Sequence, residues 1–427
     1  MSDNVIIHSS CLSGEINIPP SKSISHRAII CAALADGIST IHHIQLSKDI
    51  EATLEAVKAF GASIEYCPDS SVKIKGGLLN SVQDSTIDCK ESGSTLRFLI
   101  PLAALVEASI TFTGEGRLPE RPLDSYYALL DEHKVKYENN HGKLPLTISG
   151  TLQPGHFSIE GNISSQYITG LLIALPLLKG DSSLIITGDL ESKGYVDLTL
   201  DVLASFGIKI INKDYQSFFI EGNQRYLAKD YTVESDYSQA AFWIVAGLIG
   251  NGLTLQNINF NSKQGDRAIL DIVKQMGGEI IEKGSSLVVL PSSTSGITID
   301  VSQIPDLVPI LSVLGSVSSG TTHLMNGARL RIKESDRLTS TATELSNLGA
   351  EIMELDDSLI IKGQKYLTGG LTDSWNDHRI AMAIAVASIR CRDSVGIEGS
   401  QSVEKSYPGF WEDFKRLGGN IDEFEHR

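Results

Sequence analysis

Residues 203–210 read Leu-Ala-Ser-Phe-Gly-Ile-Lys-Ile, and this octet recurs along the chain. It joins the apolar end of a helix to a glycine and then to a short strand. Copies lie at residues 57–64, 130–137, 273–280, 345–352 and 414–421. The copy at 130–137 has Lys134 where the others have glycine. Glycine suits this position because the residue just after a helix often adopts a left-handed conformation.

The octets divide the chain into repeats. Their glycine positions are 69 to 73 residues apart, so six repeats account for the 427 residues. Each repeat reads as a buried helix, a strand, an amphipathic helix, the glycine turn and two further strands. Polar clusters open the buried helices at residues 23–25, 92–94, 164–166, 236–238, 305–306 and 376–378. Ser, Asp and Asn at such openings cap helices by accepting hydrogen bonds from unpaired backbone N–H groups.

The repeats predict an α/β (α+β) fold of two similar lobes with three repeats each. The polar stretch at residues 226–233 is the candidate hinge. The helices that the polar clusters open are apolar on nearly all sides, so they belong inside the lobes. Their N-terminal ends carry partial positive charge and attract anions. If several of these ends meet in one cleft, that cleft binds anions.

The composition is that of an ordinary globular protein, with 41% hydrophobic residues and a net charge of −16. This charge argues against nucleic acid and anionic membranes as partners but allows a small anionic ligand in a local basic pocket. The five cysteines form no Cys-x-x-Cys pair, which favours a reducing compartment. No signal sequence or apolar stretch of about 20 residues is visible. We expect a cytoplasmic protein without metal or organic cofactor.

Basic residues stand at several helix openings. Lys22 and Arg27 lie in the opening at residues 21–27, and Arg379 lies in the opening of the last repeat. A cation at a helix N-terminus is unfavourable unless an anion binds there. The alternative for the first opening is a solvated first turn.

The densest basic segment is residues 329–337, Arg-Leu-Arg-Ile-Lys-Glu-Ser-Asp-Arg. In an extended chain Arg329, Arg331 and Lys333 project to one side. On a helix Lys333 and Arg337 share a face, where a bound anion would relieve their repulsion. The alternative is an exposed charged helix start.

Five motifs together resemble the 5-enolpyruvylshikimate-3-phosphate (EPSP) synthase family. They are Pro-Ser-Lys-Ser-Ile-Ser-His-Arg at 20–27, Glu-Arg-Pro at 120–122, Ser-Ser-Gln at 164–166, Lys-Glu-Ser-Asp-Arg at 333–337 and Asp-His-Arg at 377–379. The resemblance implies a two-lobed inside-out α/β barrel of six βαβαββ repeats, with the active site in the cleft. It also implies that the N-terminal strand returns to the other lobe. The lobes then comprise residues 1–20 plus 234–427 and residues 21–233.

The resemblance implies a transferase of the shikimate pathway to chorismate and the aromatic amino acids. Such an enzyme moves the enolpyruvyl group of phosphoenolpyruvate to the 5-hydroxyl of shikimate 3-phosphate and releases phosphate. Protonation of the methylene carbon makes C2 electrophilic, the hydroxyl attacks C2, and the tetrahedral intermediate loses phosphate and a proton. This chemistry needs an acid, a base and preorganised positive charge. We expect a monomer that acts on these two small molecules.

The family motifs assign residues to each substrate. Those expected to hold shikimate 3-phosphate are Lys22, Ser23, Arg27, Ser164, Ser165, Gln166, Ser192, Tyr195, Asp306 and Lys333. Those expected to hold phosphoenolpyruvate are Lys22, Gly93, Arg121, Gln166, Arg337, Arg379 and Lys405. Asp306 is the candidate base for the 5-hydroxyl, and Glu334, with Lys333 or Lys22, is the candidate for proton transfer at the methylene carbon.

Three positions depart from the pattern common in the family. Residues 91–94 read Glu-Ser-Gly-Ser where many relatives have Asn-Ala-Gly-Thr, Arg329 replaces a frequent Asn, and Phe98 replaces a frequent Pro. Gly93 itself is retained, and a bare backbone permits close approach of a ligand at a helix start. Gly93 therefore predicts inhibition by glyphosate, a mimic of phosphoenolpyruvate.

Two other functions fit parts of the sequence. The sister enzyme that transfers enolpyruvyl to UDP-N-acetylglucosamine has the same repeats. It usually carries Lys-Asn where Lys22 and Ser23 stand, and commonly a reactive Cys in the loop at 114–121, which has none here. A six-repeat DNA clamp would instead spread Lys and Arg along helix faces toward duplex phosphates. In this sequence the cations gather at helix openings.

Overall fold

The computed structural model describes residues 4–77 and 82–424, which fold into two compact units. Lobe 1 contains the chain up to Pro19 and from Ser235 onward, and lobe 2 is Pro20–Glu234. The chain therefore passes twice between the lobes. Backbone hydrogen bonds pair the two passing segments on each side. In lobe 1 the Asp236 N–H donates to the Pro19 carbonyl at 2.9 Å, and in lobe 2 the Ser21 N–H donates to the Glu234 carbonyl at 2.8 Å.

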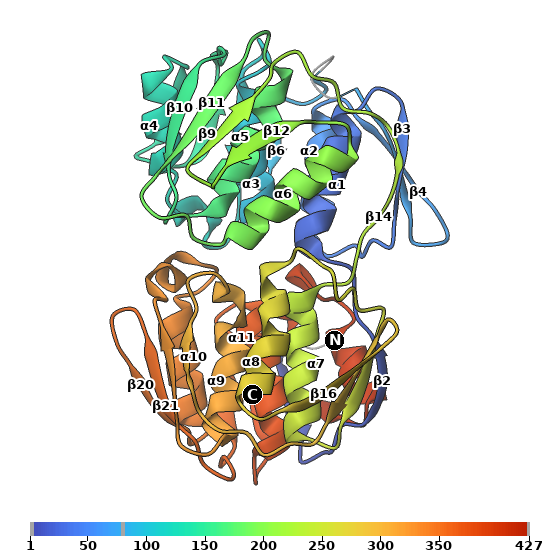
Figure 1. Ribbon diagram of the computed structural model, residues 1–427, viewed down its shortest axis with the longest axis vertical. Coiled ribbons are helices and arrows are strands. Elements are labelled where there is room, and N and C mark those ends of the chain that lie inside the picture. Colours follow the sequence, from blue (N-terminus) through green and yellow to red (C-terminus); the bar gives the residue numbers. More distant parts are fainter. Residues whose placement is uncertain (1–3, 78–81, 425–427) are drawn as a thin grey trace. The chain divides into compact units, whose positions relative to one another are not determined.

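Lobe 2 contains three βαβαββ repeats (Figure 1). The first consists of β14 (Asp230–Thr232), α1 (Lys22–Leu34), β3 (Ile38–His42), α2 (Lys48–Ala59), β4 (Ser63–Tyr66) and β5 (Val72–Lys75). The second consists of β6 (Thr86–Asp88), α3 (Gly93–Ala103), β7 (Ile110–Thr113), α4 (Asp124–Glu132), β8 (Tyr137–Asn140) and β9 (Lys143–Ile148). The third consists of β10 (His156–Glu160), α5 (Ser165–Ala174), β11 (Ser182–Thr187), α6 (Lys193–Ser205), β12 (Ile210–Lys213) and β13 (Ser217–Ile220).

Lobe 1 repeats the same order three more times. Its first repeat consists of β2 (Gly14–Asn17), α7 (Tyr237–Ile249), β15 (Leu253–Gln256), α8 (Ile269–Gln275), β16 (Glu279–Lys283) and β17 (Ser286–Leu290). Its second consists of β18 (Thr298–Asp300), α9 (Val308–Val317), β19 (Thr321–Met325), α10 (Arg337–Asn347), β20 (Glu351–Glu354) and β21 (Leu359–Lys362). Its third consists of β22 (Gly370–Asp373), α11 (His378–Ala387), β23 (Val395–Glu398), α12 (Phe410–Arg416), β24 (Asn420–Glu423) and β1 (Asn4–His8). The predicted α/β fold of six repeats is confirmed.

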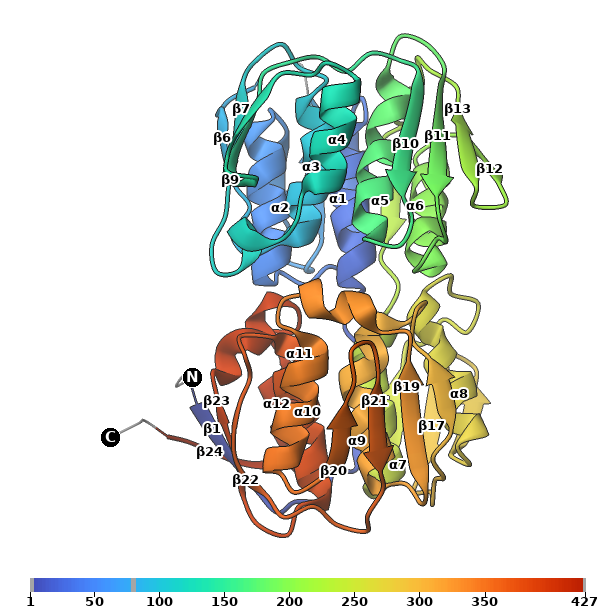
Figure 2. The same cartoon turned by 90° about the vertical axis from the view of Figure 1, so that its left-hand side faces the viewer.

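Each repeat forms one four-stranded sheet, six among the described residues. In each sheet one edge strand pairs in parallel with the strand that follows the inner helix, as β6 does with β7, and the other pairs are antiparallel. Three repeats borrow a strand from a distant part of the chain. β14 completes the sheet of α1, β2 completes that of α7, and β1 lies between β23 and β24 in the last sheet (Figure 2).

The inner helices form the cores of the lobes. In lobe 2 α3 packs against α1 and α5, and in lobe 1 α7, α9 and α11 contact one another (Figures 1 and 2). Every residue of α7 is buried. Burying one Leu, Ile or Val side chain stabilises a fold by about 1.5–3 kcal/mol, so these helices supply much of the core energy. The outer helices bury one face only, as α2 does with Ile50, Leu54 and Val57. Among the described residues no helix has the length and apolar character needed to cross a membrane.

The left-handed turn predicted after the second helix of each repeat is confirmed at all six positions. The φ angles are 108° at Gly61, 56° at Lys134, 86° at Gly207, 94° at Gly277, 87° at Gly349 and 108° at Gly418. Lys134 adopts the same backbone despite its β-carbon. The fold therefore imposes this turn even where the sequence does not favour it.

The predicted capping is confirmed at four helix openings. The side chains of Ser92, Ser164, Asp236 and Asp377 accept hydrogen bonds from backbone N–H groups of α3, α5, α7 and α11. Each bond satisfies a donor that would otherwise be unpaired at the helix start.

Two openings differ from the prediction. Ser21, just before the expected cluster, caps α1. Asp306 lies in the short 3-10 helix η4 (Pro305–Leu307), which precedes α9 and has no side-chain cap. Pro305 has no N–H to be capped, and the Asp306 carboxylate binds side chains elsewhere in lobe 1.

The prediction that residues 226–233 form a hinge is wrong, because this segment is folded into lobe 2. The Tyr226 hydroxyl donates to the Ile173 carbonyl at 2.7 Å, and β14 pairs with β3. A strand of only three residues has too little alternation to be recognised from sequence.

Lys134 offers a direct test of the turn. We expect Lys134→Gly to raise the free energy of unfolding by about 1 kcal/mol, because glycine adopts positive φ without a β-carbon clash. Urea unfolding would measure the change. Lys134→Ala is the control, since it removes the exposed side chain but keeps the β-carbon, and it should not stabilise. Equal effects of the two variants would contradict a backbone origin.

Candidate active site

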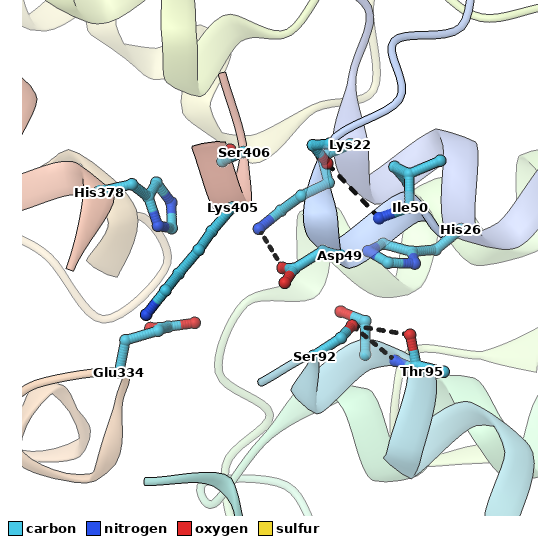
Figure 3. A network of polar contacts seen from close by, with 12 residues as sticks. Lys22, His26, Asp49, Ile50, Ser92, Thr95, Glu334, His378, Lys405 and Ser406 are labelled. Atoms are coloured by element: carbon cyan, nitrogen blue, oxygen red, sulfur yellow. Dashed lines mark hydrogen bonds and ion pairs between the residues drawn. The ribbon is translucent and has the colours of Figure 1, made fainter. Parts of the chain in front are cut away.

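Lys22 opens α1 in lobe 2 and is held by an acid on the neighbouring helix. Its Nζ lies 2.7 Å from Oδ2 of Asp49, in the first turn of α2 (Figure 3). The Lys22 and Asp49 side chains are only 16% and 14% exposed. The ion pair offsets the unfavourable position of a lysine at a helix N-terminus. It also fixes the ammonium group beside the N-terminal ends of α1 and α2.

Arg27, one turn further along α1, links its own helix to the inner helix α5 and the outer helix α6. Its guanidinium donates to the Ser23 carbonyl on α1 at 2.6 Å and to the Thr169 hydroxyl on α5 at 3.2 Å. It also donates to the Thr199 hydroxyl at 2.9 Å and the Tyr195 carbonyl at 3.2 Å, both on α6. Ser23 and Tyr195, two predicted site residues, thus lie beside Arg27.

The charge of Arg27 is buried without a carboxylate. Arg27 is 3% exposed, and all of its hydrogen-bond partners in the described part of the chain are neutral oxygens. Burial lowers the pKa of its guanidinium to about 10. A buried cation without a counterion is costly, so this position favours a bound anion.

A second group of predicted residues surrounds the start of α3. Gly93 is the first residue of the helix, and Ser92 caps it by accepting from the Thr95 N–H at 3.2 Å (Figure 3). A β-carbon on Gly93 would lie 2.6 Å from Nη1 of Arg121 and 2.9 Å from Nη1 of Arg97. Two guanidinium groups therefore rest against the bare backbone, which leaves no room for a side chain.

Gln166 is joined to the same group through Arg97. Arg97 donates to Gln166 Oε1 at 2.8 Å, and Gln166 Nε2 donates to the Ser94 hydroxyl at 3.0 Å. The Arg97 guanidinium also lies over the Tyr167 ring, 5.2 Å from its centroid. Arg97 was not among the residues expected to bind a substrate, and its contacts orient Gln166 beside Gly93.

The serines expected in lobe 2 stand at the starts of α5 and α6. Ser164 caps α5 through the Gln166 N–H at 3.3 Å, and Ser165 is the first residue of that helix. Ser192 precedes α6 with a φ of 54° and makes no capping bond. Ser192 is 2% exposed, so this left-handed backbone lies inside the lobe.

In lobe 1 the first residue of α10, Arg337, binds three carboxylates. Its guanidinium lies 2.8 Å from Asp306, 2.8 Å from Glu334 and 2.8 Å from Asp377. The Arg337 side chain is 2% exposed. Burial would lower its pKa, but the three carboxylates outweigh burial and raise it. Arg337 therefore stays charged and gathers three acids that are far apart in the sequence.

Asp306 is shared between two arginines. Its Oδ2 accepts from Arg379 Nη2 at 3.0 Å, in addition to the Arg337 bond. Burial would raise its pKa, but Arg379, Arg337 and Lys333 together hold the pKa well below its usual range. In this arrangement Asp306 is ionised and is a weak proton acceptor.

The remaining cations of lobe 1 lie beside this cluster. Arg379, the second residue of α11, also donates to the Ser238 hydroxyl at 3.0 Å. Lys405 ends the 3-10 helix η7 (Ser400–Lys405), and its Nζ donates to the Asn376 carbonyl at 2.6 Å. Lys333 is half-buried, and burial lowers its pKa to about 8, against a raising effect from Asp306.

The interpretation of residues 329–337 as an extended strand or a single helix is wrong. Residues 328–332 form the 3-10 helix η5 (Ala328–Ile332), and α10 begins only at Arg337. Lys333 and Arg337 therefore do not share a helix face. The core favours this turn because Leu330 is fully buried.

The two other arginines of this segment bind groups of the protein. Arg331 pairs with Asp336 at 2.9 Å and Glu354 at 2.8 Å, and Arg329 donates to the Ser302 carbonyl at 2.8 Å.

The acidic partners of two predicted cations, Lys22 and Arg337, could not be predicted from the sequence. Asp49 and Asp377 each neutralise a predicted cation, but an acid in the first turn or at the cap of a helix is ordinarily explained by the helix dipole. The sequence carried no signal for their partners. No group of three or more His, Cys, Asp or Glu side chains within the described ranges is arranged to hold a metal ion.

The fold and the cations at the helix starts define an α/β protein of βαβαββ repeats whose helix N-termini are suited to anionic ligands. Residues 7–414 match the family described as EPSP synthase (3-phosphoshikimate 1-carboxyvinyltransferase). The chain is 53% identical to the 3-phosphoshikimate 1-carboxyvinyltransferase of Clostridium novyi over 430 residues, covering 99% of each chain. It is 54% identical to that of Clostridium acetobutylicum over 423 residues, covering 98% of each.

A solved structure of EPSP synthase from Acinetobacter baumannii superposes with a TM-score of 0.82 at 25% identity, covering 98% of this chain and 100% of that one. The chain belongs to the EPSP synthase family.

The lobe 1 cluster makes a prediction for stability. We expect Asp377→Asn to lower the free energy of unfolding by about 3 kcal/mol, because it removes the negative charge of one buried partner of Arg337. Urea unfolding would measure it. Glu351→Gln is the control, since Glu351 pairs with Lys362 at 3.0 Å on the surface of β20 and should contribute within about 0.5 kcal/mol. Equal losses in the two variants would contradict the role of burial.

Proposed function

We propose that this chain transfers the enolpyruvyl group of phosphoenolpyruvate to the 5-hydroxyl of shikimate 3-phosphate and releases phosphate. The family match and the close relatives support the reaction. The observation that carries the chemistry is Arg27, a buried guanidinium with only neutral oxygen partners in the described chain. A phosphate group there would supply the missing negative charge.

For shikimate 3-phosphate we propose the set expected from the family motifs. In lobe 2 these residues are Lys22, Ser23, Arg27, Ser164, Ser165, Gln166, Ser192 and Tyr195, and in lobe 1 they are Asp306 and Lys333. The contacts of Arg27 with Ser23 and Tyr195 support the first group, since one cation gathers them. Helix starts at Ser165 and Lys193 add backbone N–H donors for a phosphate.

For phosphoenolpyruvate we propose Lys22, Gly93, Arg121, Gln166, Arg337, Arg379 and Lys405. In lobe 2, Arg121 lies against the bare backbone of Gly93. In lobe 1 the guanidinium groups of Arg337 and Arg379 are already bound to Asp306. An anionic substrate there would exchange with a carboxylate rather than enter an uncompensated positive site.

Displacement of the Asp306 carboxylate from Arg337 and Arg379 would change its strength as a base. While Arg337 and Arg379 bind Asp306, its pKa lies too low for it to accept a proton from a hydroxyl. When the anionic groups of phosphoenolpyruvate neutralise the two arginines, the pKa of Asp306 rises. Asp306 then becomes a better base for the 5-hydroxyl. Glu334, with Lys333 or Lys22, would transfer the proton at the methylene carbon.

The two alternatives are not favoured by the family match. Phosphate release that requires both shikimate 3-phosphate and phosphoenolpyruvate is the experiment that tests the proposal. Release with UDP-N-acetylglucosamine in place of shikimate 3-phosphate would overturn it. A mobility shift of duplex DNA at moderate salt would revive the clamp.

We further propose that the enzyme is a cytoplasmic monomer. The five free cysteines, three of them buried, support a reducing compartment. Each lobe also has its own buried core. Size-exclusion chromatography with light scattering would test the monomer.

Gly93 tests the phosphoenolpyruvate site. We expect Gly93→Ala to displace the Arg121 guanidinium and to raise KM for phosphoenolpyruvate about tenfold, the loss expected for one charge-assisted hydrogen bond. KM for shikimate 3-phosphate should change less than about twofold. In the presence of shikimate 3-phosphate, glyphosate should inhibit the unmodified enzyme, and it should inhibit Gly93→Ala less strongly. Tolerance of millimolar glyphosate by the unmodified enzyme would contradict the mimicry.

Gly155→Ala is the matched control for this variant. A β-carbon on Gly155 meets nothing within 4 Å, so the kinetics should be unchanged.

Lys333 predicts a pH dependence. Its folded pKa is about 8, below the ordinary 10.5, so its charge costs stability below pH 8 and that cost disappears as pH rises toward 10.5. Above pH 8 the lysine also loses the charge that binds an anion. KM for shikimate 3-phosphate should therefore rise up to about tenfold per pH unit above 8. Lys333→Arg keeps its charge, and an equal rise in that variant would contradict the assignment.

A further inference from the structure

The turn at residues 373–376, which joins β22 to α11, has an unfavourable backbone. Trp375 and Asn376 have φ angles of 53° and 52°, in the left-handed region that side chains rarely adopt. Two such residues in succession persist only when their surroundings hold them. Asp377 follows directly and caps α11, which begins at His378, so the turn sets where α11 starts.

Glu344 on α10 holds this turn from one side. It is 3% exposed, and its Oε1 accepts a hydrogen bond from the Trp375 indole N–H at 2.7 Å. Its Oε2 accepts from the Asp373 backbone N–H at 3.2 Å and from Asn347 Nδ2 at 3.0 Å. Both carboxylate oxygens are therefore engaged, and two of the three bonds reach the turn. Nothing in the sequence pointed to this residue.

The other side of the turn carries groups of the candidate active site. The Asn376 carbonyl accepts from Lys405 Nζ at 2.6 Å. The Asp377 carboxylate accepts from Arg337 Nε at 2.8 Å and from the Arg379 backbone N–H at 3.0 Å. The position of the turn therefore fixes a partner of two cations in the phosphoenolpyruvate set, Lys405 and Arg337, and the start of the helix that carries Arg379.

We propose that Glu344 is a positioning residue for phosphoenolpyruvate, acting through the turn at 373–376. The inference rests on the proposed function and adds a residue that the family motifs do not assign. Without the Glu344 bonds the turn relaxes from its left-handed backbone. The Asn376 carbonyl then turns from Lys405, and the Asp377 carboxylate shifts from Arg337.

Glu344→Gln is the principal test. Glutamine has one acceptor oxygen, so its amide NH2 must face either the Trp375 indole N–H or the Asp373 N–H, and both are donors. KM for phosphoenolpyruvate should rise about tenfold, as for the loss of one charge-assisted hydrogen bond. KM for shikimate 3-phosphate should change less than about twofold. A residue with a merely structural role would not separate the two constants in this way.

Trp375→Phe removes the indole donor and keeps an aromatic ring at a partly exposed position, so the variant should fold even if Glu344→Gln does not. We expect KM for phosphoenolpyruvate to rise about threefold on loss of this neutral donor. In the combined variant the amide NH2 no longer faces an indole N–H. Its KM should therefore stay well below the roughly thirtyfold rise that independent effects would give.

Glu351→Gln, the same chemical change at an exposed acid of β20, is the control and should stay within about twofold of the unmodified enzyme. If the unmodified chain releases phosphate with both substrates but Trp375→Phe leaves KM for phosphoenolpyruvate unchanged, the inference is overturned. Multiplicative effects in the combined variant would overturn it as well. If the unmodified chain lacks the reaction, the proposed function fails, and the inference with it.

Discussion

Each lobe has three inner helices that are apolar on nearly all sides. They can bury this surface only by packing against one another and against their sheets. Their flanks are apolar, but the first N–H groups of each helix have no partner within the helix. These ends must therefore meet polar side chains, water or a ligand, and they collect the polar residues of the sequence. Lys22 opens α1, Gly93 opens α3, Gln166 opens α5 and Arg379 opens α11. In each lobe the candidate site residues thus follow from how that lobe buries its core.

The buried arginines of the two lobes differ in how their charge is compensated. Arg27 in lobe 2 binds only neutral oxygens among the described residues, so an anion adds an attraction that the protein does not supply. Arg337 in lobe 1 binds three carboxylates, so an anion must exchange with one of them. The three carboxylates keep Arg337 charged although it is buried, and the arginines keep Asp306 ionised. The first arrangement leaves a positive charge available to an anion, and in the second an anion bound to Arg337 would alter the basicity of Asp306.

Much of the local structure follows from the sequence because it depends on neighbours along the chain. The left-handed turn falls at the six expected positions, including Lys134, and the caps fall at Ser92, Ser164, Asp236 and Asp377. Prediction failed where a buried side chain or a distant partner decided the backbone. Residues 328–332 form a 3-10 helix around buried Leu330, and residues 230–232 form a strand only because β3 lies beside them.

By itself the sequence determined the period of the repeat, the two kinds of helix, the turns between helix and strand, and the cations at the helix openings. These features rest on contacts within a few residues, which a local pattern records. Tertiary structure alone decided which strands β1, β2 and β14 pair with, far from their neighbours in the chain. It also decided that Arg337 gathers Asp306 and Asp377, and that Glu344 holds Trp375. Backbone pairing is indifferent to side-chain identity, and an acid can serve any cation within reach, so only the folded geometry selects the partners.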